Sequence, residues 1–183
     1  MFHGVVRYSG GADLFTETFV LYDQYGDIVY EKSDIPLQTF FISNTGSVFA
    51  LNEYHLYLYQ QDGSETMLRE LVYPNGFGFS PDGALFFASD REGIFAYSHD
   101  GMLSSAYRPG RLFASTERGS WVAVISADTL FVYEYGSLGD TEFLPSPYAR
   151  DVSFSTDGDN IQVRFPAGYD VYDTRNRTWV RRE

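Results

Sequence analysis

Tyrosine and arginine recur in short, proline-containing segments that separate apolar stretches of this chain. The clearest examples are Tyr73-Pro74-Asn75-Gly76, Tyr107-Arg108-Pro109-Gly110-Arg111 and Pro147-Tyr148-Ala149-Arg150-Asp151. A guanidinium group forms paired hydrogen bonds with a carboxylate or phosphate, and tyrosine and arginine are both enriched where binding energy concentrates. These segments therefore predict a binding surface for a partner that carries carboxylates or phosphates. Its candidate residues are Tyr73, Arg91, Tyr107, Arg108, Arg111, Tyr148, Arg150 and Asp151.

Two other interpretations of these residues stay open. In one, the loops only hold the chain between neighbouring structural units, and their proline and tyrosine residues act as spacers. In the other, Arg111 and Asp151 pair with each other inside the protein, because both stand at the start of an apolar stretch in neighbouring units.

Patterns typical of catalysis are absent from the sequence. It contains no Gly-x-Ser-x-Gly nucleophile turn, no His-Glu-x-x-His zinc motif and no phosphate-binding loop. Glycoside hydrolysis needs two carboxyl groups that face each other across the bond to be cleaved. Asp151 is the one acid in the apolar stretches at 5–9, 39–43, 76–80, 111–115 and 151–155, and Asp170, on a different predicted strand, does not complete a pair with it. We therefore expect no enzymatic activity.

Side chains that could ligate a metal are few and scattered. There is no cysteine, which excludes disulfides and thiolate metal sites. His3, His55 and His99 lack metal-binding spacing and are expected at separate surface positions. The segment Asp157-Gly158-Asp159-Asn160 lacks the spacing and the later glutamate of a calcium loop. We expect neither a metal nor a cofactor.

The charge of the chain restricts its partners. The 183 residues carry a formal net charge of −12, which opposes non-specific binding to DNA, RNA or anionic lipid. No stretch approaches the roughly 20 apolar residues of a membrane-spanning helix, and the first residues do not resemble a signal peptide. We expect no nucleic-acid partner and no membrane insertion. The expected location is cytoplasmic, or extracytoplasmic if the chain is a domain of a longer exported protein.

A turn with glycine recurs at a period of about 37 residues, within the range typical of solenoids, propellers and arrays. The first turn of each unit holds Gly10 or Gly11, Gly46, Gly83, Gly119 and Gly158. The second turn holds Gly26, Gly63, Gly101, Gly136 and Asn176. A tyrosine precedes the second turn in every unit: Tyr22, Tyr59, Tyr97, Tyr133 and Tyr172. We expect these rings to pack in the core, and not to form a series of stacking positions for a ligand.

Each unit divides into short apolar stretches typical of β-strands. First strands are predicted at 5–9, 39–43, 76–80, 111–115 and 151–155, each closed by a serine. Second strands are predicted at 48–51, 84–88, 121–126 and 161–165, and third strands at 19–22, 56–59, 94–97, 130–133 and 169–172. These strands carry apolar residues on both faces, as in a sheet packed between two others, whereas the fourth strand is more polar and suits an outer edge. No helical periodicity is sustained, so the sequence predicts an all-β fold.

Two short motifs resemble those of WD40, YVTN and related propeller repeats. Phe79-Ser80-Pro81-Asp82-Gly83 and Phe154-Ser155-Thr156-Asp157-Gly158 are similar to the turn between the first two strands of such repeats. Leu21-Tyr22-Asp23 and Val171-Tyr172-Asp173 are similar to the aromatic-Asp pair that ends the third strand. The resemblance covers the whole chain without identifying a subfamily. It implies β-propeller blades with the first strand innermost, and ligands bound at the loops that precede the first strand and follow the second.

We predict one domain over residues 1–183, with units at about 3–36, 37–74, 75–109, 110–147 and 148–183. The predicted fold is a five-bladed β-propeller of four-stranded antiparallel blades, whose ring closes by packing between the first and fifth blades. The alternative is an open arc of five blades, completed by dimerisation into a homo-oligomer or by missing repeats.

The sequence leaves two kinds of function open. The first is a non-catalytic protein-interaction or scaffold module, which binds another protein or a peptide segment over the tyrosine and arginine loops. The second is a lectin-like or small-ligand-binding propeller with a pocket at the mouth of the central channel. We favour the first, because a sugar site encoded by the repeat would repeat its residues. The residues that open the five first strands instead differ: Val5, Thr39, Gly76, Arg111 and Asp151.

Overall fold

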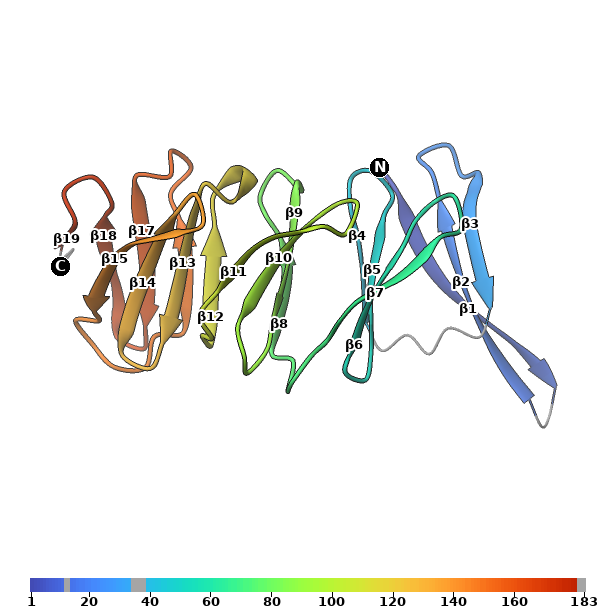
Figure 1. Ribbon diagram of the computed structural model, residues 1–183, viewed down its shortest axis with the longest axis horizontal. Helices are drawn as coiled ribbons and strands as arrows, with labels where there is room; N and C mark the ends of the chain where they lie inside the picture. The colour runs from blue at the N-terminus through green and yellow to red at the C-terminus, as the bar shows by residue number, and fades with distance from the viewer. Residues whose placement is uncertain (12–13, 34–38, 181–183) are drawn as a thin grey trace. The chain divides into compact units, whose positions relative to one another are not determined.

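The computed structural model describes residues 1–11, 14–33 and 39–180 (Figure 1). In this part of the chain the fold is all-β, with nineteen strands and one short 3-10 turn, η1 (Glu117–Gly119). The strands form five antiparallel sheets, and each sheet is built from one consecutive stretch of the chain. This arrangement follows from short aromatic and β-branched stretches that alternate with tight turns. The prediction of an all-β fold is confirmed.

The sheets follow one another in chain order. The first contains β1 (His3–Gly11), β2 (Leu14–Tyr22) and β3 (Ile28–Ser33). The second contains β4 (Thr39–Ile42), β5 (Val48–Asn52), β6 (His55–Tyr59) and β7 (Glu65–Glu70). The third contains β8 (Gly76–Phe79), β9 (Leu85–Ser89), β10 (Ile94–Ser98) and β11 (Leu103–Tyr107). The fourth contains β12 (Leu112–Ser115), β13 (Trp121–Ser126), β14 (Thr129–Glu134) and β15 (Ser137–Phe143). The fifth contains β16 (Asp151–Phe154), β17 (Asn160–Phe165), β18 (Gly168–Asp173) and β19 (Thr178–Val180).

The chain divides into two compact units. Unit 1 comprises Met1–Val72 and His99–Met102, and unit 2 comprises Tyr73–Ser98 and Leu103–Glu183. Unit 1 therefore holds the first and second sheets, and unit 2 holds the strands of the third, fourth and fifth. Closure of the five sheets into a ring stays a prediction.

A side-chain hydroxyl closes the turn between the first and second strands of each four-stranded sheet. In the third sheet Ser80 Oγ accepts a hydrogen bond from the Leu85 amide at 3.0 Å. The same bond joins Ser43 to Ser47, Ser155 to Asn160 and, in the fourth sheet, Thr116 to Trp121. The glycine in the turn has a positive φ, 71° at Gly83, a conformation that other residues rarely adopt. The predicted serine–glycine turns are confirmed, except that Thr116 replaces Ser115 in the fourth unit.

The first sheet differs from the prediction. β1 pairs directly with β2, and His3 lies opposite Tyr22. The second strands of the other sheets face their tyrosines in the same way, in the pairs Val48–Tyr59, Phe86–Tyr97, Val122–Tyr133 and Ile161–Tyr172. β1 is thus a second strand, and the interpretation of 5–9 as a first strand is wrong. Gly10 and Gly11 lie within β1, so they do not form the predicted turn.

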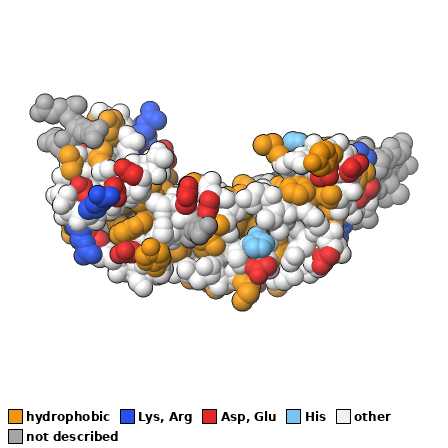
Figure 2. All heavy atoms as spheres, turned by 90° about the horizontal axis from the view of Figure 1, so that it is seen from above, with side chains coloured by type: hydrophobic (Ala, Val, Ile, Leu, Met, Phe, Trp, Pro, Cys, Tyr) orange, Lys and Arg blue, Asp and Glu red, His pale blue; other side chains and the backbone are white. Residues whose placement is uncertain are grey.

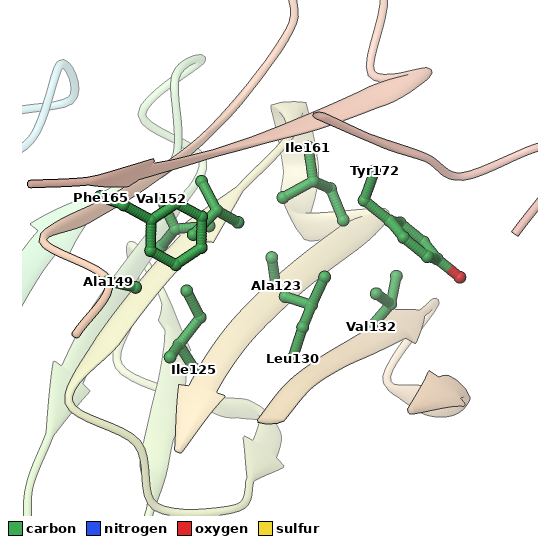
Figure 3. Close-up of a cluster of buried hydrophobic side chains, with 10 residues drawn as sticks. Ala123, Ile125, Leu130, Val132, Ala149, Val152, Ile161, Phe165 and Tyr172 are labelled. Atoms are coloured by element: carbon green, nitrogen blue, oxygen red, sulfur yellow. The ribbon is translucent and has the colours of Figure 1, made fainter. Parts of the chain in front are cut away.

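Neighbouring sheets within each unit pack face to face. In unit 1, buried Phe19, Leu21 and Tyr30 of the first sheet meet Val48, Ala50 and Tyr59 of the second. In unit 2, one cluster joins Phe87, Ile94 and Tyr107 of the third sheet to Val122, Val124 and Phe131 of the fourth. A second cluster joins Ile125, Leu130 and Val132 of the fourth sheet to Ile161, Phe165 and Tyr172 of the fifth (Figure 3). Because apolar burial stabilises by about 25 cal/mol per Å², these clusters fix the order of the sheets within each unit.

The repeated tyrosines belong to this core. Tyr59, Tyr97, Tyr133 and Tyr172 are each at most 8% exposed. The hydroxyl of Tyr172 donates to Asp140, and that of Tyr59 to Glu65 at 3.4 Å. Burial and the bond to Asp140 raise the pKa of Tyr172. Tyr22 is half-buried, with the guanidinium of Arg7 5.5 Å from its ring centroid. The series therefore packs as predicted and does not form a ladder for a ligand.

Tyr30 offers a stability test of this core. Its side chain is buried, and its hydroxyl has no hydrogen-bond partner within the described residues. Burial, followed by the nearby Glu65 carboxylate, raises the pKa of Tyr30 to about 12. Removing an unpartnered buried hydroxyl costs nothing, so we expect Tyr30→Phe to raise the free energy of unfolding by about 1 kcal/mol. Urea denaturation measures this change. A loss of about 1 kcal/mol or more would contradict the prediction, because it would show a hydroxyl that is hydrogen-bonded.

Candidate binding surface

All eight candidate residues lie along one edge of the sheets in unit 2. Neighbouring strands of an antiparallel sheet run in opposite directions. The start of the first strand, the end of the second, the start of the third and the end of the fourth therefore lie at the same edge. Backbone hydrogen bonds fix this edge in the same way in each sheet. The amide of Asn75 donates to Ser89 O at 2.9 Å, that of Arg111 to Ile125 O at 2.9 Å, and that of Arg150 to Arg164 O at 2.7 Å. We call this the loop edge, formed by the loops at 73–75, 90–93, 108–111 and 144–150.

Two tyrosines on the loop edge have an unusual backbone conformation. Tyr73 and Tyr148 each stand three residues before a first strand, β8 and β16. Their φ angles are 56° and 64°, in the left-handed region, and their side chains are 67% and 76% exposed. A bulky residue in this conformation carries strain of about 1–3 kcal/mol, and such strain concentrates at functional positions. Both rings are therefore presented to solvent from equivalent, constrained positions.

The arginines of the loop edge differ in their contacts. Arg111 donates from its guanidinium to the backbone oxygen of Ala149, in the loop that leads to the fifth sheet. It does not pair with Asp151, whose carboxylate accepts the amide of Val152 at 2.9 Å. Arg91 and Arg150 are exposed and form no ion pair within the described residues. These two guanidinium groups are thus available to an external anion.

Tyr107 lies in the core, whereas Arg108 is exposed and lies against a core residue. Tyr107 is 5% exposed, and its ring lies edge-on to Tyr133 with 5.0 Å between the ring centroids. Burial raises the pKa of Tyr107. The guanidinium of Arg108 lies 3.7 Å from the ring centroid of Phe131, which it covers. The sequence places both residues on the correct edge, but the direction of their side chains depends on the neighbouring strands.

A groove of about 950 Å³ runs along the first strands of unit 2 and reaches the loop edge at Arg111. Half-buried Phe77, Phe113 and Phe154 lie on β8, β12 and β16 and give the groove apolar walls. Sequence reasoning missed this groove, because it assigned the aromatic residues of the first strands to the core. The available signal was an aromatic residue at the second or fourth position of each first strand.

A second hollow of about 630 Å³ lies on the fifth sheet and is lined by Arg150, Asp151, Gln162, Arg164 and Tyr169 among others. Along β17 the exposed Gln162 and Arg164 alternate with the buried Ile161, Val163 and Phe165. The expectation of apolar residues on both faces is therefore wrong for β17, which has one polar face. The strict alternation in the sequence of this unit was the signal that could have found the hollow.

The two acids considered for catalysis lie on opposite faces of the fifth sheet. Asp151 is paired with Arg164, whereas Asp170 is paired with Val163, the next residue along β17. Successive residues of a strand point to opposite faces. The two carboxyl groups therefore do not face each other across a shared site.

The acidic residues of the opposite edge stabilise their own turns. The Asp157 carboxylate accepts hydrogen bonds from Ser155 Oγ and from the Asp159 amide, and these bonds hold the pKa of Asp157 below its usual value. Asp173 likewise accepts the amide of Asn176 at 2.9 Å, which lowers its pKa. On the face shown in Figure 2 the acidic side chains are spread in small groups and form no continuous patch. This distribution does not indicate a single acidic binding site.

We expect chelation to leave the stability of the protein unchanged. Within residues 1–11, 14–33 and 39–180, no group of histidine, aspartate and glutamate side chains is arranged to hold a metal ion. Arg175 forms an ion pair with the carboxylate of Asp159. Asp157 and Asp159 are therefore not both free to ligate a metal in the turn at 157–160. The melting temperature with and without EDTA measures this, since a bound metal would stabilise the folded state by mass action. A clear decrease with EDTA would point to Asp157 and Asp159.

No family model matches the sequence, and no curated protein sequence matches it. Solved structures do share its fold. A chain in the crystal structure of the Mitotic Checkpoint Complex is 15% identical with a TM-score of 0.58, over 78% of this chain and 48% of that one. Hsv2 of Kluyveromyces marxianus is 14% identical with a TM-score of 0.62, over 92% of this chain and 59% of that one. Hydrazine synthase of Kuenenia stuttgartiensis is 14% identical with a TM-score of 0.58, over 82% and 49%.

This protein has a β-propeller fold. The similarity to these solved structures, together with consecutive four-stranded antiparallel sheets, confirms the predicted fold of propeller blades. At these identities the likeness concerns the fold alone. The propeller described here spans 48% to 64% of the length of these and one further solved chain that it matches. Among its described residues, no helix is long and apolar enough to cross a membrane.

Proposed function

We propose that this propeller is a non-catalytic interaction module that binds an extended segment of a partner protein at the loop edge of unit 2. The observation that carries the proposal is the pair of exposed tyrosines, Tyr73 and Tyr148, held in left-handed conformations beside arginines without an ion-pair partner. Exposed aromatic rings and arginines are the side chains that dominate binding energy at protein interfaces. Because the backbone at both positions is already fixed, a partner that binds there orders only the side chains.

The groove supports an extended partner. Its apolar walls at Phe77, Phe113 and Phe154 suit the apolar side chains of a peptide, and its opening at Arg111 suits a carboxylate. The protein carries a net charge of −12, so a strongly acidic partner is repelled at long range. The proposed partner segment therefore combines apolar residues with one or two acidic groups.

We expect loss of the loop-edge side chains to weaken peptide binding. A phage-displayed library of random peptides, selected on the immobilised protein, supplies ligands whose dissociation constants are then measured by titration calorimetry. Tyr148→Ala and Arg150→Ala should each raise the dissociation constant about tenfold, which is about 1.4 kcal/mol. The matched controls are Tyr135→Ala and Arg177→Ala. Both control residues are exposed, both have a positive φ, 47° and 52°, and both lie on the opposite edge.

The ranking of the variants decides between the surfaces. If the controls weaken binding and the loop-edge variants do not, the interface lies at the opposite edge and the proposal fails. It also fails if selection yields no peptide that binds the protein more tightly than an unselected one.

A small-ligand function is the second candidate, and the hollow on the fifth sheet favours it. Arg150, Asp151, Gln162 and Arg164 converge there with the ring of Tyr169, and a few converging polar groups beside an aromatic ring are typical of small-ligand pockets. Thermal-shift measurements with a panel of monosaccharides, disaccharides and short carboxylates test this function. A shift that is lost in Arg164→Ala but kept in Tyr148→Ala would locate the ligand in the hollow and not along the loop edge.

A further inference from the structure

The groove along the first strands of unit 2 has ends of opposite charge. Among the described residues that line it, three are charged: Arg111, Glu117 and Asp157. Arg111 lies at the loop edge, directly before β12. Glu117 and Asp157 lie in the turns that follow β12 and β16, at the opposite edge of the same sheets. The groove is therefore positive at one end and negative at the other, with apolar walls between them.

Each of these charged groups is available to a ligand. The Arg111 guanidinium donates to the backbone oxygen of Ala149 and has further N–H donors. Glu117 is exposed. The hydrogen bonds of its turn lower the pKa of Asp157, so its carboxylate is ionised at neutral pH. No ion pair joins Arg111, Glu117 or Asp157 to another described side chain, so all three can interact with charges of a partner.

The first strands also offer backbone hydrogen bonds to a ligand in the groove. β8 and β12 each pair with a second strand on one side and, within the described residues, with no strand on the other. The Ser80 and Thr116 amides donate to the second strand, and successive residues direct their backbone groups to opposite sides. The backbone groups of Phe77 and Phe113 therefore face away from it. Because both residues line the groove, an extended peptide backbone is the ligand that these groups suit.

We propose that the partner segment lies lengthwise in this groove, with an acidic residue at Arg111, apolar residues beside the phenylalanines of the first strands, and a basic residue at Glu117 and Asp157. This inference rests on the proposed function and adds the order of the charges. Five residues separate Arg111 from Glu117, and an extended segment has the same rise per residue as a strand. The acidic and basic residues of the partner thus stand about five or six positions apart.

A panel of synthetic peptides with blocked ends tests the order of the charges. The two outer residues of each peptide are glutamate or lysine in every combination, and the interior residues alternate between isoleucine and serine. Dissociation constants are measured by fluorescence anisotropy. The tighter of the two mixed-charge peptides should bind about tenfold more tightly than either like-charge peptide. The reason is that a like-charge peptide always places one charge against an end of the groove with the same sign.

A double variant, Glu117→Lys with Asp157→Asn, reverses the charge at the acidic end of the groove. Asparagine keeps the side-chain oxygen that accepts the hydrogen bonds of the turn. The mixed-charge peptide should bind this variant about tenfold more weakly, and the peptide with two glutamates should bind it more tightly. The matched control is Glu134→Lys with Asp173→Asn, which changes the net charge equally at the same edge but outside the groove. The control should change each dissociation constant less than about twofold.

The outcomes separate this inference from the proposed function. The inference fails if the mixed-charge peptides bind no more tightly than the like-charge peptides, or if the two double variants act alike. Binding that ignores the order of the charges but is weakened by Tyr148→Ala contradicts this inference alone and leaves the proposed function standing. If no peptide of the panel and no peptide selected from the random library binds the protein, the proposed function fails as well.

Discussion

Replacing Tyr172 by alanine should lower the free energy of unfolding by about 3–5 kcal/mol, the range for removal of a large buried aromatic side chain. Tyr172 is 1% exposed and lies between the fourth and fifth sheets. Its ring meets Trp179 edge-on, with 5.4 Å between the ring centroids, and its hydroxyl donates to Asp140 of β15. Alanine therefore opens a cavity where two sheets meet and removes a hydrogen bond between them. Urea denaturation measures the loss.

Two controls separate the packing of Tyr172 from its hydrogen bond. Tyr172→Phe keeps the ring and should cost about 1 kcal/mol, the net value of one hydrogen bond. Tyr25→Ala removes a tyrosine that is 80% exposed and should change stability by less than about 0.5 kcal/mol. If Tyr172→Ala behaves like Tyr25→Ala, the repeated tyrosines do not stabilise the contacts between sheets.

The all-β fold and its repeats could be predicted because their signals are local. A first-strand serine followed by an Asp-Gly pair fixes a turn through bonds between near neighbours, as at Ser80 and Gly83. The tyrosine before the second turn marks the end of the third strand in every unit, because each sheet needs a large side chain at the same depth. Such signals depend on a few adjacent residues, and the sequence displays them directly.

The place of β1 in the first sheet could not be predicted in the same way. The adjacent valines Val5 and Val6 suit either a first or a second strand. The assignment depends on the pairing of His3 with Tyr22, residues joined by no local motif. Gly10 and Gly11 occupy the place of the first-turn glycine of the other units, and the prediction of a first strand at 5–9 depended on this match.

The candidate surface was predicted only in its position. Antiparallel strand order is enough to bring Arg111 and Arg150 to one edge. The direction of a side chain there depends on other strands. The exposed Arg108 lies over the ring of Phe131, and the buried ring of Tyr107 meets Tyr133. The groove is formed by β8, β12 and β16, so it is encoded in three separate units and in no single motif.

Gly110→Ala should destabilise the protein by about 1–3 kcal/mol, the usual cost of inserting an atom into a closely packed site. A Cβ at Gly110 would lie 2.3 Å from Val124 Cγ1 and 2.9 Å from the carbonyl oxygen of Ile125. Val124 is fully buried and branched at Cβ, so it cannot turn away. The loop must then move off β13, which breaks the bond from the Arg111 amide to Ile125 O.

Gly78→Ala is the matched control for Gly110→Ala. Gly78 lies on β8 in the same unit, and a Cβ there would meet no atom within 4 Å. Because its φ is not in the left-handed region, alanine should leave stability unchanged or raise it by about 0.4–1 kcal/mol through the unfolded chain. Thermal and urea denaturation of both variants measure the difference. Since Gly110 adjoins Arg111, Gly110→Ala should also weaken peptide binding at the loop edge. If Gly110→Ala keeps full stability and full binding, the loop moves freely away from β13 and the prediction is wrong.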